Sequence, residues 1–213
     1  KTILKRTDII LSNSKNTSRD IETTFPFAKE KIKTIYLGKD EFYKPAINNS
    51  ALSALGIQQP YFHFVGTIEP RKDLRTLLRA YTKFRQTNEN KVQLVIAGGK
   101  GWKSDAFFKD YENHSFRDDI ILTGYVDKSC LPVLHTYSIA LIYPSIYEGF
   151  GLPILEALSC GGTVITAQNS SLTEVGGGLA LYFATNNEQS LYEVMQMAVE
   201  FQVTDETRER RLS

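Results

Sequence analysis

Two glutamates flank a glycine-rich turn in the apolar stretch YPSIYEGFGLPILEALSCG, residues 143–161. Glu148 directly precedes the turn Gly149 to Gly151, and Glu156 follows it inside an expected helix. Glycine lets a ligand approach the backbone, and amide groups at the start of a helix attract anions. Carboxylates accept hydrogen bonds from neighbouring hydroxyls. The spacing predicts an anion or hydroxyl site at the turn, with an acid for alcohol groups on either side.

The turn also supplies backbone donors, because the N–H groups of Phe150, Gly151 and Leu152 precede the expected helix. We expect Glu156 to accept a ribose diol on one side of a diphosphate, and Glu148 a sugar hydroxyl on the other. Taken singly, each acid is better explained without a ligand. Glu156 suits the first turn of a helix, and Glu148 suits an exposed loop. Only the combination favours a site.

A basic pair, Arg71 and Lys72, follows Pro70, and we expect it to open a helix. Two adjacent cations at a helix N-terminus are unfavourable unless an anion meets them. The pair therefore suits a diphosphate. Taken alone, it is better explained as solvated surface charge, the usual condition of lysine and arginine.

Short apolar runs alternate with amphipathic ones from residue 61 onward, and the runs show little polar alternation. This pattern predicts a parallel sheet covered on both faces, in a doubly wound, Rossmann-like α/β domain. The expected strands are 61–65, 92–98, 119–124, 139–144, 163–167 and 179–183. The expected helices are 73–85, 103–113, 128–137, 152–161 and 187–202.

Ligands in such sheets bind outside the carboxyl ends of the strands. Gly66 ends the first strand of the domain, and Gly124, Tyr125 and Val126 end the third. We expect Gly124 to Val126 to offer backbone groups to a planar base, and Tyr125 a stacking face. As a single signal this is weak, and Tyr125 taken alone is better explained as ordinary packing.

Residues 1–45 do not follow this alternation. We interpret them as the last elements of another α/β lobe, beginning on a strand, with a linker at 46–52. The Rossmann-like lobe covers 53–203. Residues 204–213, which read as a charged helix, open a truncated C-terminal segment. We therefore expect the chain to be a fragment.

The composition excludes several classes of function. Lys and Arg number 25 against 24 Asp and Glu, so the chain has no general attraction for nucleic acid. The only cysteines, Cys130 and Cys160, suit a reducing compartment, and no apolar run is long enough to cross a bilayer. His63, His114 and His135 lack metal-ligand spacing, and there is no D-x-D pair, so we expect no metal and no cofactor.

Several segments together resemble a known family. FVGTIEPRKDLRTLLRAY, LVIAGGKGW, ILTGYVDKSCLPVLHTYSIALIYPSIYEGFGLPILEALSCGGTVI and SLTEV occur in order. They resemble the C-terminal, nucleotide-sugar lobe of the retaining family-four glycosyltransferases of the two-lobed GT-B fold. TDIILSNSKNTSRDI and KIKTIYLGKDEFYKP resemble the end of the acceptor lobe. The form GTIEPRK is similar to bacterial mannosyl- and rhamnosyltransferases of polysaccharide synthesis.

The resemblance implies an enzyme that moves a hexose from a nucleotide-diphosphate sugar, with GDP-mannose as the guess. Transfer would retain anomeric configuration, need no metal, and end on a saccharide or lipid-linked acceptor bound by the missing N-terminal lobe. It also implies a cytoplasmic protein that associates peripherally with the inner face of the membrane through that lobe. We expect the fragment alone to bind donor and not to turn over.

Carried over position by position, the resemblance makes Arg71, Lys72 and Glu148 catalytic. The first two match the basic pair on the diphosphate, and Glu148 matches the acid on the transferred sugar. Glu156 matches the acid on the ribose. The residues implied to bind the nucleotide sugar are Gly66, Arg71, Lys72, Gly124, Tyr125, Val126, Glu148, Gly149, Phe150, Gly151, Leu152 and Glu156.

Two departures from the family pattern matter. Thr67 stands where many members carry arginine, and an unusual GGGLALYF follows Glu174. Two alternatives stay open: a sugar-nucleotide epimerase of the same two-lobed shape, and a glycosyltransferase-like lobe that only binds or scaffolds. The retained basic pair and both acids argue against a lobe that has lost its site.

Overall fold

A six-stranded parallel sheet forms the centre of the computed structural model, which describes residues 2–58, 60–88 and 90–202. The strand order is β5-β4-β3-β6-β7-β8. The predicted doubly wound α/β class is therefore confirmed. The strands are β3 (Tyr61–Val65), β4 (Gln93–Ala97), β5 (Ile120–Gly124), β6 (Ala140–Tyr143), β7 (Val164–Ala167) and β8 (Leu181–Phe183).

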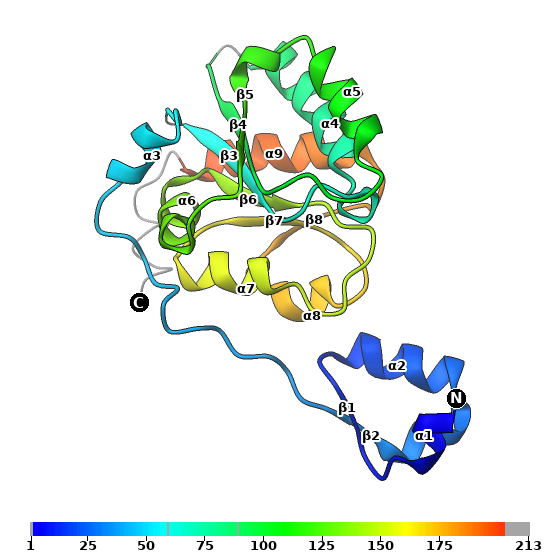
Figure 1. Cartoon of the computed structure of the whole chain (residues 1–213). Helices are drawn as coiled ribbons and strands as arrows, with labels where there is room; N and C mark the ends of the chain where they lie inside the picture. The colour runs from blue at the N-terminus through cyan, green and yellow to red at the C-terminus, as the bar shows by residue number, and fades with distance from the viewer. Residues whose placement is uncertain (1, 59, 89, 203–213) are drawn as a thin grey trace.

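Helices cover both faces of this sheet (Figure 1). One layer holds α4, α5 and α9, and the other holds α6, α7 and α8, as right-handed crossovers require when the strand order reverses. The helices are α3 (Ser50–Ala54), α4 (Leu74–Thr87), α5 (Asp105–Glu112), α6 (Leu131–Tyr137), α7 (Leu152–Ser159), α8 (Leu172–Gly176) and α9 (Glu188–Gln202), with short 3-10 turns η2 (Pro70–Lys72), η3 (Arg117–Asp119) and η4 (Lys128–Cys130).

The two-residue period of the strands divides the core. In β4, Leu94 and Ile96 belong to the main apolar cluster, while Val95 and Ala97 join a second cluster with Leu134 of α6. The four β4 side chains are all buried, although they point alternately to the two faces of the sheet. Burial on both faces accounts for the lack of polar alternation along the strand.

The strand order reverses between β3 and β6. β3 lies between β4 and β6, although β6 comes third after it along the chain. The loops that leave β3 and β6 therefore start side by side at the carboxyl edge of the sheet. The backbone N–H of Ile146 donates to the carbonyl of Arg71 at 2.8 Å and joins the two loops directly. This reversal is where doubly wound sheets bind ligands.

The N-terminal residues form a small separate sheet. β1 (Ile10–Ser12) pairs in parallel with β2 (Ile32–Thr34), and α2 (Lys15–Thr24) and the 3-10 helix η1 (Pro26–Lys31) connect them. Helix α1 (Thr2–Arg6) precedes β1, so the expectation that the chain begins on a strand is wrong.

The connection to the larger sheet packs against it. The Ala46 amide donates to Thr136 Oγ1 at 3.0 Å, and the Tyr137 hydroxyl donates to the Ala46 carbonyl at 3.2 Å. Helix α3 begins at Ser50, inside the expected linker 46–52. The domain boundaries remain a prediction, and the charged segment 204–213 lies outside the described residues.

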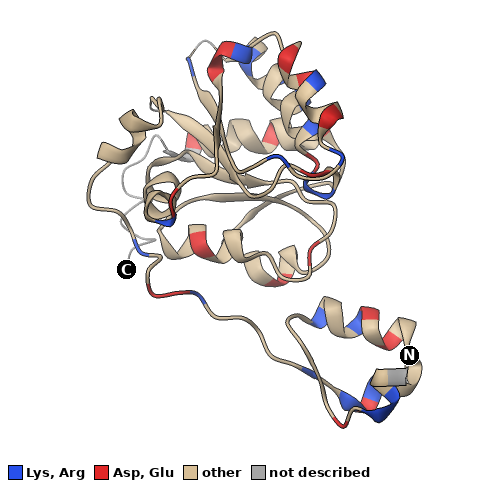
Figure 2. Ribbon diagram, viewed as in Figure 1, with Lys and Arg blue, Asp and Glu red and all other residues tan. Residues whose placement is uncertain are grey.

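The charged residues of α4 are all basic, whereas α5 and α2 carry charges of both signs (Figure 2). This mixture agrees with the balanced composition. Within the part of the chain that the structure describes, no helix has the length and apolar character needed to cross a membrane.

Candidate functional site

The loop after β3 places the basic pair differently from the prediction. Arg71 and Lys72 lie in the 3-10 turn η2, and α4 begins only at Leu74. Asp73 separates the two elements because its backbone is left-handed, with φ of 47°. The expectation that the pair opens a helix is therefore wrong, and a helix N-terminus does not add to its charge.

Lys72 is buried, with 7% of its surface exposed. Its Nζ lies 2.7 Å from Glu148 Oε1 and 2.5 Å from the Tyr143 hydroxyl, and 4.6 Å from the centre of the Tyr143 ring. The interpretation of Lys72 as a solvated surface charge is wrong. Burial lowers the pKa of Lys72, and the neighbouring Glu148 only partly offsets this effect.

Arg71 is half-exposed and bridges two acids. Its guanidinium lies 2.5 Å from Glu148 Oε2 and 2.7 Å from Glu69 Oε1, and it also donates to the Tyr147 carbonyl at 3.0 Å. Glu69 accepts a second hydrogen bond, from the indole of Trp102, at 2.8 Å. Arg71 is thus held from both sides.

Glu148 joins the two cations. It is 8% exposed, so the alternative of an exposed loop acid is wrong. Burial would raise the pKa of Glu148, but Lys72 and Arg71 together outweigh burial and hold that pKa below its usual value. Its backbone is fixed as well: its N–H donates to Ser170 Oγ at 3.1 Å, and its carbonyl accepts from Ser171 Oγ at 2.8 Å.

The turn after Glu148 leads into α7 as expected. Gly151 occupies the N-cap position with φ of 109°, and no side chain caps the helix. The positive φ favours glycine here, and a Cβ would also crowd Leu172, because it would lie 3.0 Å from Leu172 Cδ2. The Gly149 carbonyl accepts from Thr17 Oγ1 at 3.2 Å, and the Phe150 ring lies 6.4 Å from that of Tyr36. The N-terminal segment therefore packs on this turn.

Glu156 lies in α7, which begins at Leu152 as predicted. It is the fifth residue of the helix, beyond the first turn, so the helix-terminus interpretation is wrong. The acid is half-buried, and burial raises its pKa, while a hydrogen bond with Tyr43 and the charge of Lys128 act in the opposite direction. Tyr43 belongs to the connection between the two sheets and is 5% exposed.

A cavity of about 270 Å³ opens between the ends of β3, β4 and β5, and its lining residue Gly66 lies next to the Lys72 side chain. It brings together predicted residues Gly66, Tyr125 and Val126, but Gly124 does not line it. Tyr125 is 89% exposed, so its interpretation as ordinary packing is wrong. The lining residues are Val65, Gly66, Thr67, Ala97, Gly98, Gly99, Tyr125, Val126, Lys128 and Leu131.

Four polar residues around the site were not predicted from the sequence: Tyr43, Glu69, Tyr143 and Glu174. Glu69 could have been found, since it stands two residues before Arg71 at the carboxyl end of β3. Tyr143 is the last residue of an apolar strand, and a tyrosine there is as readily explained by packing of its ring as by a polar role of its hydroxyl. Tyr43 and Glu174 contact residues more than 100 positions away, which no local pattern indicates.

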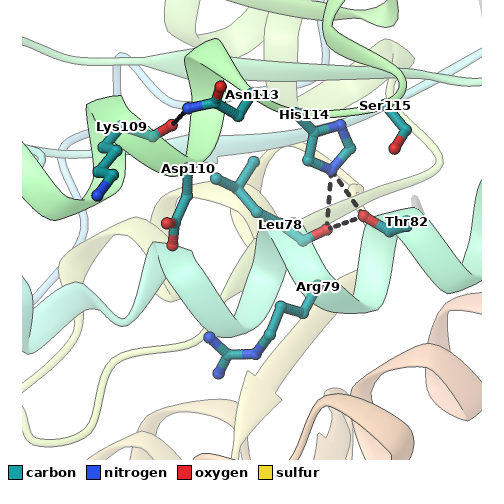
Figure 3. Close-up of a pocket in the computed structure, with 8 residues that line it drawn as sticks. All are labelled: Leu78, Arg79, Thr82, Lys109, Asp110, Asn113, His114 and Ser115. Carbon is teal, nitrogen blue, oxygen red and sulfur yellow. Dashed lines mark hydrogen bonds between the residues drawn. The ribbon is translucent and has the colours of Figure 1, made fainter.

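A second cavity, of about 380 Å³, lies between α4 and α5, away from the predicted site residues (Figure 3). His114 lines it, with Nε2 lying 2.8 Å from Thr82 Oγ1 and 3.1 Å from the Leu78 carbonyl. The other histidines, His63 and His135, contact each other at 2.9 Å and are fully buried. Among the described residues, no group of three His, Cys, Asp or Glu could hold a metal ion.

Residues 50–211 match the family described as Glycosyl transferases group 1. The chain belongs to this family. The resemblance noted from the sequence, to the family-four C-terminal lobe of the GT-B fold, is confirmed. The match covers the whole six-stranded sheet and every residue of the predicted site.

Curated relatives of this group 1 chain include bacterial mannosyltransferases. O-antigen chain mannosyltransferase B of Escherichia coli is 34% identical over 187 residues, which cover 86% of this chain and 49% of the relative. O-antigen chain mannosyltransferase RfbU of Salmonella typhimurium is 26% identical, with 89% and 50% covered. The chain thus spans about half the length of these two relatives.

Solved structures share the fold of this family member at low sequence identity. A glycosyltransferase from Rickettsia africae superposes with a TM-score of 0.85 at 16% identity, covering 96% of this chain and 56% of that one. HepE of Anabaena, solved in complex with UDP and glucose, gives a TM-score of 0.80 at 20% identity, covering 97% and 57%. These similarities show the fold alone.

Proposed function

We propose that this chain supplies the donor site of a metal-independent, retaining hexosyltransferase that uses a nucleotide-diphosphate sugar. The observation that carries the proposal is the convergence of Arg71 and Lys72 on Glu148, at the reversal point of the sheet and beside the turn that starts α7. Family membership supports the reaction class.

The diphosphate binds to Arg71 and Lys72 and to the backbone N–H groups at the start of α7. Breaking the sugar–phosphate bond puts negative charge on this leaving group. A close cation–anion pair gives about 4 kcal/mol at an effective dielectric constant near 20. Even half of that, felt mainly in the transition state, corresponds to more than a tenfold increase in rate.

The nucleoside occupies the cavity beside the pair. A volume of about 270 Å³ lies just below the usual range for small-molecule sites, roughly 300–1,000 Å³. The exposed ring of Tyr125 and the backbone at Val126 face the base, and Glu156 accepts the ribose hydroxyls. Glu148 accepts a hydroxyl of the transferred sugar.

The donor sugar is mannose in this proposal, because two relatives named above are mannosyltransferases of O-antigen chains. The nucleotide is GDP on the family resemblance alone. The acceptor is a saccharide or a lipid-linked saccharide, bound by the part of the longer relatives that this chain does not span. That part also provides peripheral membrane association at the cytoplasmic face.

Calorimetric titration of the chain with GDP, UDP, dTDP and GDP-mannose tests the donor site. We expect GDP and GDP-mannose to bind most tightly, and Lys72→Ala to weaken GDP by about tenfold or more, because a charged hydrogen-bonding partner of the diphosphate is lost. Unchanged GDP affinity in Lys72→Ala would contradict the assignment. A sugar-transfer assay of the full-length protein distinguishes an enzyme from a lobe that only binds.

A further inference from the structure

Both cations of the site are already engaged by one side chain. Arg71 contacts Glu148 Oε2 at 2.5 Å, and Lys72 contacts Oε1 of the same carboxylate at 2.7 Å. The two oxygens of Glu148 thus bind the same two groups that would bind a diphosphate. With Glu69 on Arg71 at 2.7 Å, the cluster holds two positive and two negative charges.

A neutral cluster does not simply accept a diphosphate. An anion placed on Arg71 and Lys72 beside Glu148 would be repelled by the carboxylate, and the cations cannot serve both anions at full strength. We infer that a diphosphate displaces Glu148 from Arg71 and Lys72, and that only the displaced carboxylate is available to sugar hydroxyls. This inference rests on the proposed donor site and specifies the order in which its groups act.

The surroundings of Glu148 allow such an exchange to occur in side chains alone. Hydrogen bonds to Ser170 and Ser171 fix the backbone of Glu148 on both sides. Its carboxylate can therefore rotate while the turn that starts α7 keeps its place.

The cations remain in position when the carboxylate leaves. Arg71 keeps Glu69 and the Tyr147 carbonyl as partners, and Lys72 keeps the Tyr143 hydroxyl at 2.5 Å. Each cation therefore presents its remaining N–H groups to an incoming phosphate without being pulled out of the site.

The exchange also explains how phosphate and sugar recognition become linked. Separating a buried carboxylate from two cations is unfavourable unless another anion replaces it. A sugar hydroxyl is neutral and cannot replace it, whereas a diphosphate can. Binding of the diphosphate thus prepares Glu148 for the sugar, and by linkage the sugar strengthens the hold on the diphosphate.

Glu148→Gln tests this inference, because glutamine has the same shape and no charge. We expect Glu148→Gln to bind inorganic pyrophosphate about fivefold more tightly than the unaltered chain, or better, since the competing charge-assisted hydrogen bonds are weakened. We also expect the unaltered chain to prefer GDP-mannose over GDP, because the displaced carboxylate accepts sugar hydroxyls, and the same variant should lose this preference. Isothermal titration calorimetry measures both quantities at one ionic strength.

The control is Glu112→Gln. It makes the same change in net charge at a single exposed residue, the last of α5. We expect its pyrophosphate affinity to stay within about twofold of the unaltered chain, as a distant exposed charge is screened. Glu148→Ala provides a second variant if Glu148→Gln does not fold, and the same increase is expected.

Two results can be told apart. Unchanged or weaker pyrophosphate binding in Glu148→Gln, with Lys72-dependent binding in the unaltered chain, would overturn the exchange and leave the donor site standing. Pyrophosphate and GDP binding that ignore Lys72 would overturn the donor site and, with it, the exchange.

Discussion

The carboxylate of Glu174 accepts hydrogen bonds from the backbone N–H groups of Asn16, at 2.7 Å, and of its neighbour Lys15, at 2.8 Å. These amides open α2, so an acid on α8 of the larger sheet occupies the positive end of a helix in the N-terminal segment. The Tyr36 hydroxyl donates to the same carboxylate at 3.1 Å. Glu174 therefore binds the N-terminal segment to the larger domain, next to the turn Gly149 to Gly151.

Glu174→Ala should lower the free energy of unfolding by about 1 kcal/mol, the usual effect of losing an acceptor at a helix N-terminus. Urea denaturation followed by circular dichroism measures this change. Glu174→Gln should lose less, because its amide oxygen still accepts one hydrogen bond. Equal stability of the unaltered chain and Glu174→Ala would show that the contact does not hold the segment.

Glu156→Gln should weaken binding of GDP by about tenfold and leave inorganic pyrophosphate nearly unaffected, because the ribose is the part that this acid contacts in the proposed site. Calorimetric titration of both ligands gives the two ratios. Matching losses for GDP and pyrophosphate would exclude the ribose role. Titration with 2′,3′-dideoxy-GDP adds a check, since the unaltered chain should bind it about as weakly as the variant binds GDP.

Gly98→Ala should destabilise the fold by roughly 3 kcal/mol or more, because overpacking against backbone cannot be relieved by side-chain movement. A Cβ at Gly98 would lie 1.8 Å from the carbonyl oxygen of Gly66, at the end of β3. Gly99→Ala is the matched control, as nothing lies within 4 Å of a Cβ there, and we expect it to stay within about 0.5 kcal/mol. Thermal unfolding of the two variants side by side makes the comparison. Similar stabilities of the two variants would contradict the close approach of Gly98, after β4, to the Gly66 carbonyl, after β3.

The buried pair of His63 and His135 predicts loss of stability in acid. Burial lowers the pKa of His135 to about 3 and that of His63 well below its usual 6.5. Between pH 6.5 and about 3 the unfolded chain therefore binds protons that the folded pair does not. The free energy of unfolding must fall as the pH falls, by about 2 kcal/mol at pH 5 for His135, and His63 adds to the loss in the same direction.

Urea denaturation at pH 7 and pH 5 measures this fall. In the double variant His63→Gln, His135→Gln the difference between the two pH values should shrink by the contribution of the pair. A pH dependence that the double variant leaves unaltered would assign the acid sensitivity to carboxylates instead.

The sequence allowed the neighbourhood of Arg71, Lys72 and Glu148 to be predicted from topology alone. Parallel strands end at one edge, and the loops after β3 and β6 meet there. The ion pairs themselves were not predicted, because spacing along the chain does not fix where side chains point. The helix expected at Arg71 failed for a similar reason: the left-handed backbone of Asp73 interrupts it.

Contacts between distant segments were beyond the reach of sequence patterns. Glu174 meets α2 across 158 positions, and its own surroundings in SLTEV carry no sign of that partner. Tyr125 shows the opposite case. Its place after β5 was predicted, but its exposure depends on the absence of neighbours above the strand end, which only the packed fold determines.

The hydrogen bond from Ile146 to the Arg71 carbonyl has a consequence for protein engineering. It joins the loop after β3, which carries Arg71 and Lys72, to the loop after β6, which carries Glu148, so that a change in one loop displaces the other. In the proposed donor site, grafting residues 144–151 from another glycosyltransferase to change sugar selectivity would therefore also shift Arg71 and alter its contact with the diphosphate. Successful grafts should need both loops transplanted together.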